Sequence, residues 1–214
     1  VIPSSVTNID DNAFAGCNSL KRVHLSSSLT EIKYSLFENC SSLEEIEIPS
    51  SVTKISYAAF KNCKSLKHVK IPSTVTFISK FAFANCESLI NIELPSSLTV
   101  INQNTFNVCK KLLSIKIPPS VKSIQNNAFR NCYSIKQIVI PSSVKIIGEK
   151  SFAYCKSLKN VQIPSSVVEI GSYAFACCPS LKKFTIPQTV TKIGNGIFDL
   201  RIKLTIEFNK NLLI

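Results

Sequence analysis

Residues 48–69 read Ile-Pro-Ser-Ser-Val-Thr-Lys-Ile-Ser-Tyr-Ala-Ala-Phe-Lys-Asn-Cys-Lys-Ser-Leu-Lys-His-Val, and the next residues, Lys-Ile-Pro, begin the pattern again. Phenylalanines repeat at 23-residue intervals, at Phe14, Phe37, Phe60, Phe83, Phe106, Phe129, Phe152, Phe175 and Phe198. Cysteines follow at the same interval, at Cys17, Cys40, Cys63, Cys86, Cys109, Cys132, Cys155 and Cys178. An unbroken period of this length predicts one array of stacked repeats, in which each repeat contacts only its neighbours.

Each repeat contains a short segment of the form Leu-x-x-Ile-x-Ile, as in residues 43–48. Its last positions alternate apolar and polar residues, which is the pattern of a half-buried strand. Ile46 and Ile48 are expected to point inward, and Glu45 and Glu47 outward. The proline that follows lacks the N–H group that a sheet needs, so we expect the strand to end there.

The second half of each repeat predicts a minor strand and then a short helix. Residues 52–55 alternate like a strand. Ser56 occupies a position filled mostly by helix N-cap residues, and Ala59, Phe60 and Cys63 would share one face of a helical turn. The Asn62 position holds Gly or Asn in most repeats, which are the residues that tolerate a left-handed helix end. A helix of about five to seven residues would depend on packing against its neighbours.

The pattern Leu-x-x-Ile-x-Ile-Pro-Ser-Ser-Val-x-x-Ile-x-x-x-Ala-Phe-x-x-Cys-x-Ser resembles the BspA-like, or Treponema-type, leucine-rich repeats, from Val1 to about Phe198. With the 23-residue period it predicts an α/β fold: a right-handed leucine-rich-repeat solenoid, a horseshoe or rod, with a parallel concave sheet and short convex helices. The resemblance implies protein–protein or cell-surface binding without catalysis.

The array of repeats is expected to occupy residues 1–198, and residues 199–214 to form a degenerate C-terminal capping repeat. Arg201 stands where the cysteine belongs, and the alternation of Ile206 and Phe208 comes one residue early. Terminal repeats of solenoids are commonly atypical in this way.

Composition excludes a disordered chain and leaves the compartment open. Hydrophobic residues make up 45% and charged residues 18%, and the formal net charge is +12. A basic balance favours acidic partners, but the lysines are spread over all repeats without a block of five or six like charges. No apolar run reaches the roughly 18 residues of a membrane span. No signal peptide is visible, although the chain begins inside a repeat.

The nine cysteines do not have the spacing of a metal site or a disulfide framework. Equivalent side chains of stacked repeats point the same way, which does not suit a disulfide. We therefore expect the cysteine column to be reduced, buried and apolar, with Cys177 as the most reactive thiol. Many free thiols mildly favour an intracellular location, whereas the resemblance allows the cell surface.

Neither an enzyme nor a metal or cofactor site is predicted. The two histidines, His24 and His68, lie in different columns. Glu45 would lie beside His68, yet no nucleophile or oxyanion donor accompanies the pair. Two histidines and two glutamates on an open sheet also lack the closed shell of a zinc site. The alternating charges are better explained as a ladder of ion pairs across the strands.

The outward strand positions are the candidate partner-binding residues. They are Arg22, His24, Glu45, Glu47, His68, Lys70, Asn91, Glu93 and Lys116. A second candidate surface is an apolar flank, made of Tyr34, Tyr57, Phe77, Phe81, Val100 and Ile146.

The sequence predicts a non-catalytic protein–protein interaction module that uses the surface of the solenoid. One alternative is an intracellular adaptor or regulator of a signalling enzyme such as a Ser/Thr phosphatase; the other is a surface adhesion protein. Nucleic acid is not favoured as a partner, because the outward columns mix signs and hold no aromatics. A weak homodimer through the N-terminal end is also expected.

Overall fold

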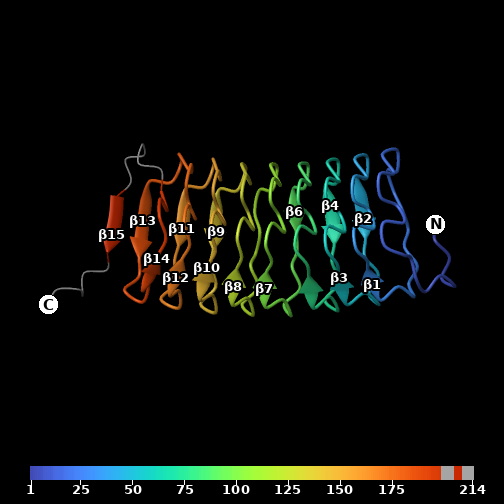
Figure 1. Cartoon of the computed structure of the whole chain (residues 1–214), viewed down its shortest axis with the longest axis horizontal. Coiled ribbons are helices and arrows are strands. Elements are labelled where there is room, and N and C mark those ends of the chain that lie inside the picture. Colours follow the sequence, from blue (N-terminus) through green and yellow to red (C-terminus); the bar gives the residue numbers. More distant parts are fainter. Residues whose placement is uncertain (199–204, 209–214) are drawn as a thin grey trace.

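The computed structural model describes residues 1–198 and 205–208, and it shows a rod of stacked repeats. The first residues lie at one end of the rod, and the last described strands lie at the other (Figure 1). All strand pairs of the described chain are parallel and join neighbouring repeats, as the 23-residue period predicted.

Two sets of short strands run along the rod. The first set lies on the face that we call the β2–β4 face: β2 (Glu45–Glu47), β4 (His68–Lys70), β6 (Asn91–Ile92), β9 (Gln137–Val139), β11 (Asn160–Gln162), β13 (Lys183–Ile186) and β15 (Thr205–Phe208). The second set is β1 (Glu31–Ile32), β3 (Lys54–Ile55), β5 (Phe77–Ile78), β7 (Val100–Ile101), β8 (Ser123–Ile124), β10 (Ile146–Ile147), β12 (Glu169–Ile170) and β14 (Lys192–Ile193).

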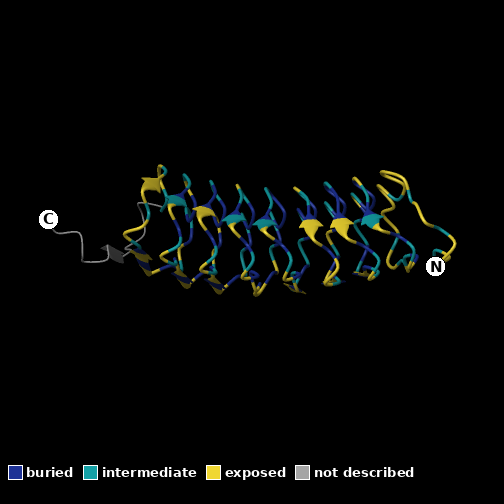
Figure 2. Ribbon diagram, turned by 90° about the horizontal axis from the view of Figure 1, so that it is seen from below, coloured by how far each residue is buried: buried dark blue, intermediate teal, exposed yellow. Residues whose placement is uncertain are grey.

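The register of the strands repeats the sequence period. Glu45 pairs with His68 and Ile46 with Val69 in the first set, and Ile32 pairs with Ile55 in the second. The inward residues of both sets are buried, apart from the first and last repeats. In Figure 2 the inner side of the ribbon is buried along most of the rod, while the repeat at the N-terminal end is largely exposed. The core is therefore one continuous column and not a central cluster.

The predicted short convex helices are wrong, and so is the α/β class, because the described residues contain no helix. In the segment from Ser56 to Cys63, backbone N–H groups take two destinations in alternation. Those of Ala59 and Lys61 donate within the repeat, to the carbonyl three residues earlier, whereas those of Ala58 and Phe60 donate to the next repeat. Half of the backbone N–H groups that a helix would use therefore form hydrogen bonds between neighbouring repeats instead.

This alternation places two residues of each repeat at positive φ, four residues apart. One position includes Ala58 (φ 53°) and Phe81 (φ 61°), and the other includes Asn62 (φ 62°) and Val108 (φ 63°). The sequence predicted left-handed backbone at the second position from its Gly and Asn residues. It did not predict the first, where the residue types are too varied to indicate it.

Val108 is strained, because a β-branched side chain rarely adopts a positive φ. In the three preceding repeats this position holds asparagine, and the asparagine side chains form a ladder of hydrogen bonds. Asn62 Nδ2 donates to Asn39 Oδ1 at 2.8 Å, and Asn85 Nδ2 donates to Asn62 Oδ1 at 2.6 Å. Val108→Asn should relieve the strain and extend this ladder, raising the free energy of unfolding by about 1–2 kcal/mol. Urea unfolding measures the change. The reverse substitution, Asn131→Val, should destabilise by a similar amount, and a destabilised Val108→Asn protein would contradict the explanation.

Stacked rings fill the centre of the rod. From Phe14 to Phe175, successive phenylalanine rings lie 5.3–5.8 Å apart between centroids, with interplanar angles of 5–10°. Offset stacking at this distance is favourable. Near the C-terminal end the order changes, because Phe184 occupies a strand position held elsewhere by Ile or Val. Its ring packs against Phe175 at 4.9 Å and Phe198 at 4.7 Å.

The buried cysteines form a thiol column, which comprises Cys40, Cys63, Cys86, Cys109, Cys132, Cys155 and Cys178. All are free, as the sequence predicted, but Cys17 is exposed and does not belong to the buried set. Each thiol donates to the phenylalanine carbonyl 26 residues earlier: Cys63 Sγ lies 3.1 Å from Phe37 O, which also accepts the Cys40 N–H. The cysteines are therefore hydrogen-bond donors between repeats as well as small apolar side chains.

The last described strand keeps the solenoid pairing with a shortened period. Thr205 pairs with Lys183 and Phe208 with Ile186, a spacing of 22 residues, so the alternation does come one residue early. The rest of the segment expected to form a capping repeat, residues 199–204 and 209–214, lies outside the described residues.

Candidate functional site: the β2–β4 face

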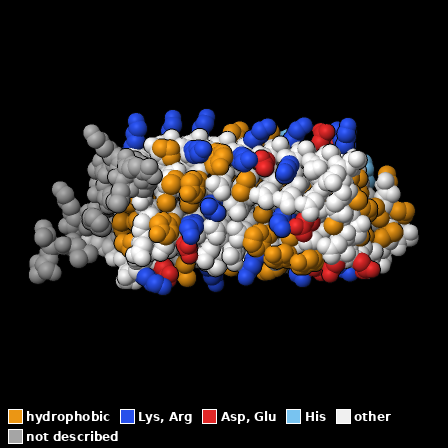
Figure 3. All heavy atoms as spheres, turned by 45° about the horizontal axis from the view of Figure 1, so that its top comes forward, with side chains coloured by type: hydrophobic (Ala, Val, Ile, Leu, Met, Phe, Trp, Pro, Cys, Tyr) orange, Lys and Arg blue, Asp and Glu red, His pale blue; other side chains and the backbone are white. Residues whose placement is uncertain are grey.

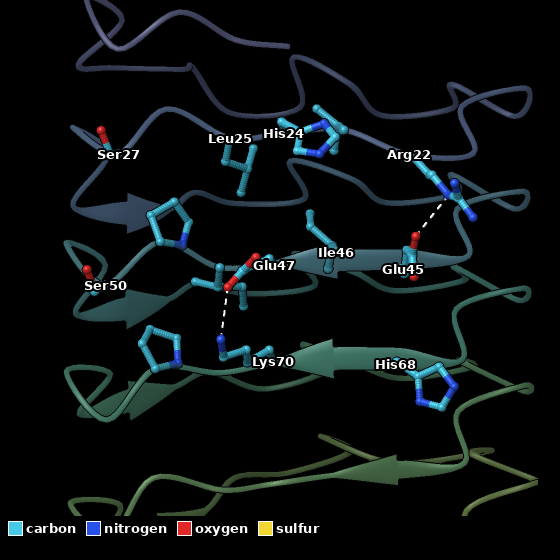
Figure 4. Close-up of a pocket in the computed structure, with 14 residues that line it drawn as sticks. Arg22, His24, Leu25, Ser27, Glu45, Ile46, Glu47, Ser50, His68 and Lys70 are labelled. Carbon is cyan, nitrogen blue, oxygen red and sulfur yellow. Dashed lines mark hydrogen bonds and ion pairs between the residues drawn. The ribbon is translucent and has the colours of Figure 1, made fainter.

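The β2–β4 face carries a hollow of about 790 Å³ near the N-terminal end (Figure 4). It spans three successive repeats, and its lining includes Arg22, His24, Glu45, Glu47, His68 and Lys70. The strands β2 and β4 put alternate side chains on this face, so the charged residues stand outward while Ile46 and Val69 enter the core.

Two ion pairs cross this hollow in opposite directions. Glu45 Oε1 lies 2.9 Å from Arg22 Nε in the preceding repeat, and Glu47 Oε1 lies 3.0 Å from Lys70 Nζ in the following one. All four side chains are more than half exposed. Exposed pairs of this kind contribute at most about 1 kcal/mol, so breaking either pair costs little free energy.

The two histidines have no side-chain partner among the described residues. In Figure 4, His24 lies in the first row of the hollow and His68 on β4, while Glu45 points toward Arg22. Glu45 and His68 are paired through their backbones, yet the carboxylate is engaged by the arginine. This geometry gives no support to an acid–base pair.

The remaining predicted residues extend the face toward the middle of the rod. Asn91, Glu93 and Lys116 are exposed, as predicted for outward positions. Asn91 belongs to β6, whereas Glu93 and Lys116 lie outside the strands. The expected alternating charge ladder is thus formed only in part, since no ion pair joins Glu93 to Lys70 or Lys116.

The predicted apolar flank is divided into separate groups. Tyr34 stacks on Tyr57 with centroids 5.1 Å apart, and Phe81 lies 5.4 Å from Tyr57. The other members lie on the second set of strands: Phe77 pairs with Lys54, and Val100 and Ile146 flank Ser123. The structure therefore brings together three aromatic rings and leaves Val100 and Ile146 two repeats apart.

Burial controls the chemistry of the thiol column. It raises the pKa of the Cys40 thiol from an ordinary value of 9.0 to about 11 and that of Cys178 to about 12. The pKa values of the five thiols between them are raised well above 9.0 for the same reason. The column is protonated at neutral pH and offers no nucleophile.

Two further features are absent from the described residues. No group of three or more His, Cys, Asp and Glu side chains is arranged to hold a metal ion in that part of the chain. Among the same residues there is also no helix of the length and apolarity that would cross a membrane.

The family profile described as BspA type leucine rich repeat region matches residues 1–109 and 76–205. The chain belongs to this family. The 23-residue register of the stacked strands accounts for the match, and the resemblance inferred from the sequence is confirmed.

Solved bacterial structures are similar to this chain over most of its length. A leucine-rich repeat protein from Bacteroides ovatus is 36% identical, with a TM-score of 0.73 over 78% of this chain and 45% of that one. A leucine rich cell surface protein from Faecalibacterium prausnitzii is 29% identical (TM-score 0.66, 86% of this chain and 59% of that one). A T. pallidum leucine rich repeat protein is 26% identical (TM-score 0.60, 91% and 70%).

The chain thus spans about half the length of the first two of these proteins. The search of curated proteins gave no match.

Proposed function

We propose that this chain is a non-catalytic protein-binding module whose β2–β4 face receives the partner. The observation that carries the proposal is the charged hollow, in which exposed ion pairs hold both signs of charge on one sheet. Extended solenoid surfaces are suited to binding other proteins. Family membership supports the same class, because leucine-rich-repeat proteins are typically binding or surface modules.

A surface adhesion role has one observation in its favour, the cell surface designation of the F. prausnitzii relative. No observation on residues 1–198 and 205–208 favours the alternative, an adaptor for a Ser/Thr phosphatase.

Photo-crosslinking tests where the partner binds. A photoreactive amino acid at Ser50, which lines the hollow, should capture a protein from either the extracellular or the intracellular fraction of the source organism. The fraction distinguishes adhesion from an adaptor role. Ser142 is the matched control, because it is exposed and occupies the same repeat position four repeats further on. Equal capture from both positions would remove the hollow as the site.

Charge reversal then tests the mechanism of binding. Glu45→Lys combined with Glu47→Lys should slow association with the captured protein by about tenfold and change the salt dependence of the rate, because long-range charge steers encounter. Stopped-flow measurements at two salt concentrations give both values. Unchanged association would rule out the hollow as the site.

Two structural proposals accompany this function. We propose residues 199–214 as the segment that closes the stack, supported by the parallel pairing of β15 with β13. A weak homodimer is also proposed, supported by the half-buried Val6, Ile9, Phe14 and Val23, which are apolar surface that a second copy could cover.

A further inference from the structure

Positive charge is concentrated in one half of the rod. Residues 110–198 carry 13 Lys and Arg but only 2 Asp and Glu, whereas residues 1–109 carry 9 of each. The net charge of the described repeats therefore comes from the C-terminal half. Such an asymmetry between halves indicates a polyanionic partner for the charged half.

Three of these lysines form a row at one edge of the β2–β4 face, which we call the lysine rim (Lys136, Lys159 and Lys182). Each immediately precedes a strand of that face, β9, β11 or β13. The Lys159 N–H donates to Lys136 O at 2.8 Å, so these residues lie one strand spacing apart, about 4.8 Å. All three are exposed, and none has a carboxylate partner within residues 1–198.

The space-filling view agrees with this placement. Figure 3 shows Lys and Arg side chains along the upper rim of the rod, with few acidic side chains among them toward the C-terminal end. Like charges held side by side repel one another, and a ligand that carries repeated negative charges would relieve that repulsion.

A groove of about 450 Å³ adjoins the rim between β11 and β13. Its polar lining consists of Asn160, Gln162, Ser165, Lys183 and Thr185. Side-chain amides and hydroxyls both donate and accept hydrogen bonds, as the hydroxyl groups of a sugar do. No carboxylate of residues 1–198 lines the groove, and the outward residues of β9, β11 and β13 include no aromatic.

We propose that the lysine rim and this groove bind an acidic polysaccharide, a sulfated or carboxylated glycan that lies along the rod. The lysines pair with its anionic groups, and the amides and hydroxyls of the groove bind its hydroxyl groups. Single-stranded nucleic acid fits less well, because its recognition uses aromatic side chains on which bases stack. This site is separate from the charged hollow, so it goes beyond the protein-binding function proposed above.

Heparin is the probe for a direct binding measurement. Release of counterions from about three anions predicts an affinity that falls roughly tenfold to fiftyfold between about 50 and 200 mM salt. The triple variant Lys136→Glu, Lys159→Glu, Lys182→Glu should lose at least about tenfold in affinity at the lower salt concentration and most of this salt dependence. Its control is Lys21→Glu, Lys64→Glu, Lys80→Glu, which makes the same change in net charge at exposed lysines of the neutral half. The control should bind within about threefold of the wild type.

A second pair of variants tests the groove. Asn160→Ala with Gln162→Ala should weaken heparin binding severalfold and leave binding of inorganic polyphosphate unchanged, because polyphosphate has no sugar hydroxyls. Equal losses in the two lysine variants would overturn the site, since only net charge would then matter. Tighter, rim-dependent binding of polyglutamate or poly-thymidine than of heparin would overturn the polysaccharide assignment. Melting temperatures of all variants establish that they are folded.

Discussion

The protein is expected to unfold cooperatively near pH 10, because the thiol column cannot ionise while it is buried. An unfolded cysteine loses its proton above its ordinary pKa of 9.0, whereas burial raises the folded pKa to about 11 at Cys40 and to about 12 at Cys178. The contribution of the column is complete below pH 9 and is lost as the pH rises, since the unfolded state then binds fewer protons. At pH 10 each thiol that ionises only on unfolding costs on the order of 1 kcal/mol, and the seven together cost several kcal/mol, which is a large part of the stability of a whole domain.

Circular dichroism during urea unfolding at several pH values measures this loss. The variant Cys86→Ala with Cys109→Ala is less stable at pH 7 because of the cavities, but its stability should fall less steeply above pH 9, by about two sevenths. An unchanged slope would rule the thiols out as the cause. Alkylation at pH 8 is a second check: Cys17 and Cys177 should react in the native protein, and the thiol column only after denaturation.

Removing one ring from the middle of the phenylalanine stack should let the two ends of the rod unfold separately. Phe106 is fully buried, and its ring lies 5.8 Å from Phe83 and 5.5 Å from Phe129. Phe106→Ala should cost about 3–5 kcal/mol, as large cavities in cores do. Because each repeat is stabilised by its neighbours alone, the weakened interface should also let the two ends unfold separately.

Denaturant unfolding and calorimetry should each show two transitions for the Phe106→Ala protein and one for the unmodified chain. Phe14→Ala is the control, since this ring belongs to the same stack but is only half buried and has one stacking neighbour. It should cost about 1 kcal/mol and leave a single transition. A single transition in the Phe106→Ala protein would show that coupling extends beyond adjacent repeats.

Sequence periodicity was sufficient to predict how the repeats stack, but it was insufficient to predict the path of the chain within a repeat. Columns such as Phe60 and Cys63 repeat every 23 residues, so their neighbours in space follow directly from the period. The helix was predicted from the spacing of Ala59, Phe60 and Cys63, which buried turns satisfy equally well. Which carbonyl an N–H group meets depends on the adjacent repeat, and propensities of single residues do not record that choice.

The candidate sites could also be predicted only in part. Strand alternation predicted that Glu45 and Lys70 are exposed. It did not predict which residue each charge pairs with, because every outward residue has one neighbour on either side along the stack. The lysine rim was missed for a different reason. Residues such as Lys159 were judged against the whole chain, and counting charges separately in each half would have revealed their concentration.

The hydrogen bonds that alternate N–H groups make to the next repeat determine what happens when the gene gains or loses a repeat. Since Phe60 donates to Ala82 and Asn62 to Ala84, every repeat presents its neighbour with nearly the same set of donors and acceptors. Recombination that deletes or duplicates a unit of 23 codons would therefore rejoin matching edges, and the product would be a shorter or longer rod with its surface columns still aligned. Each unit would change the rod by one strand spacing, about 4.8 Å, which makes length a heritable variable that can be adjusted in fixed steps.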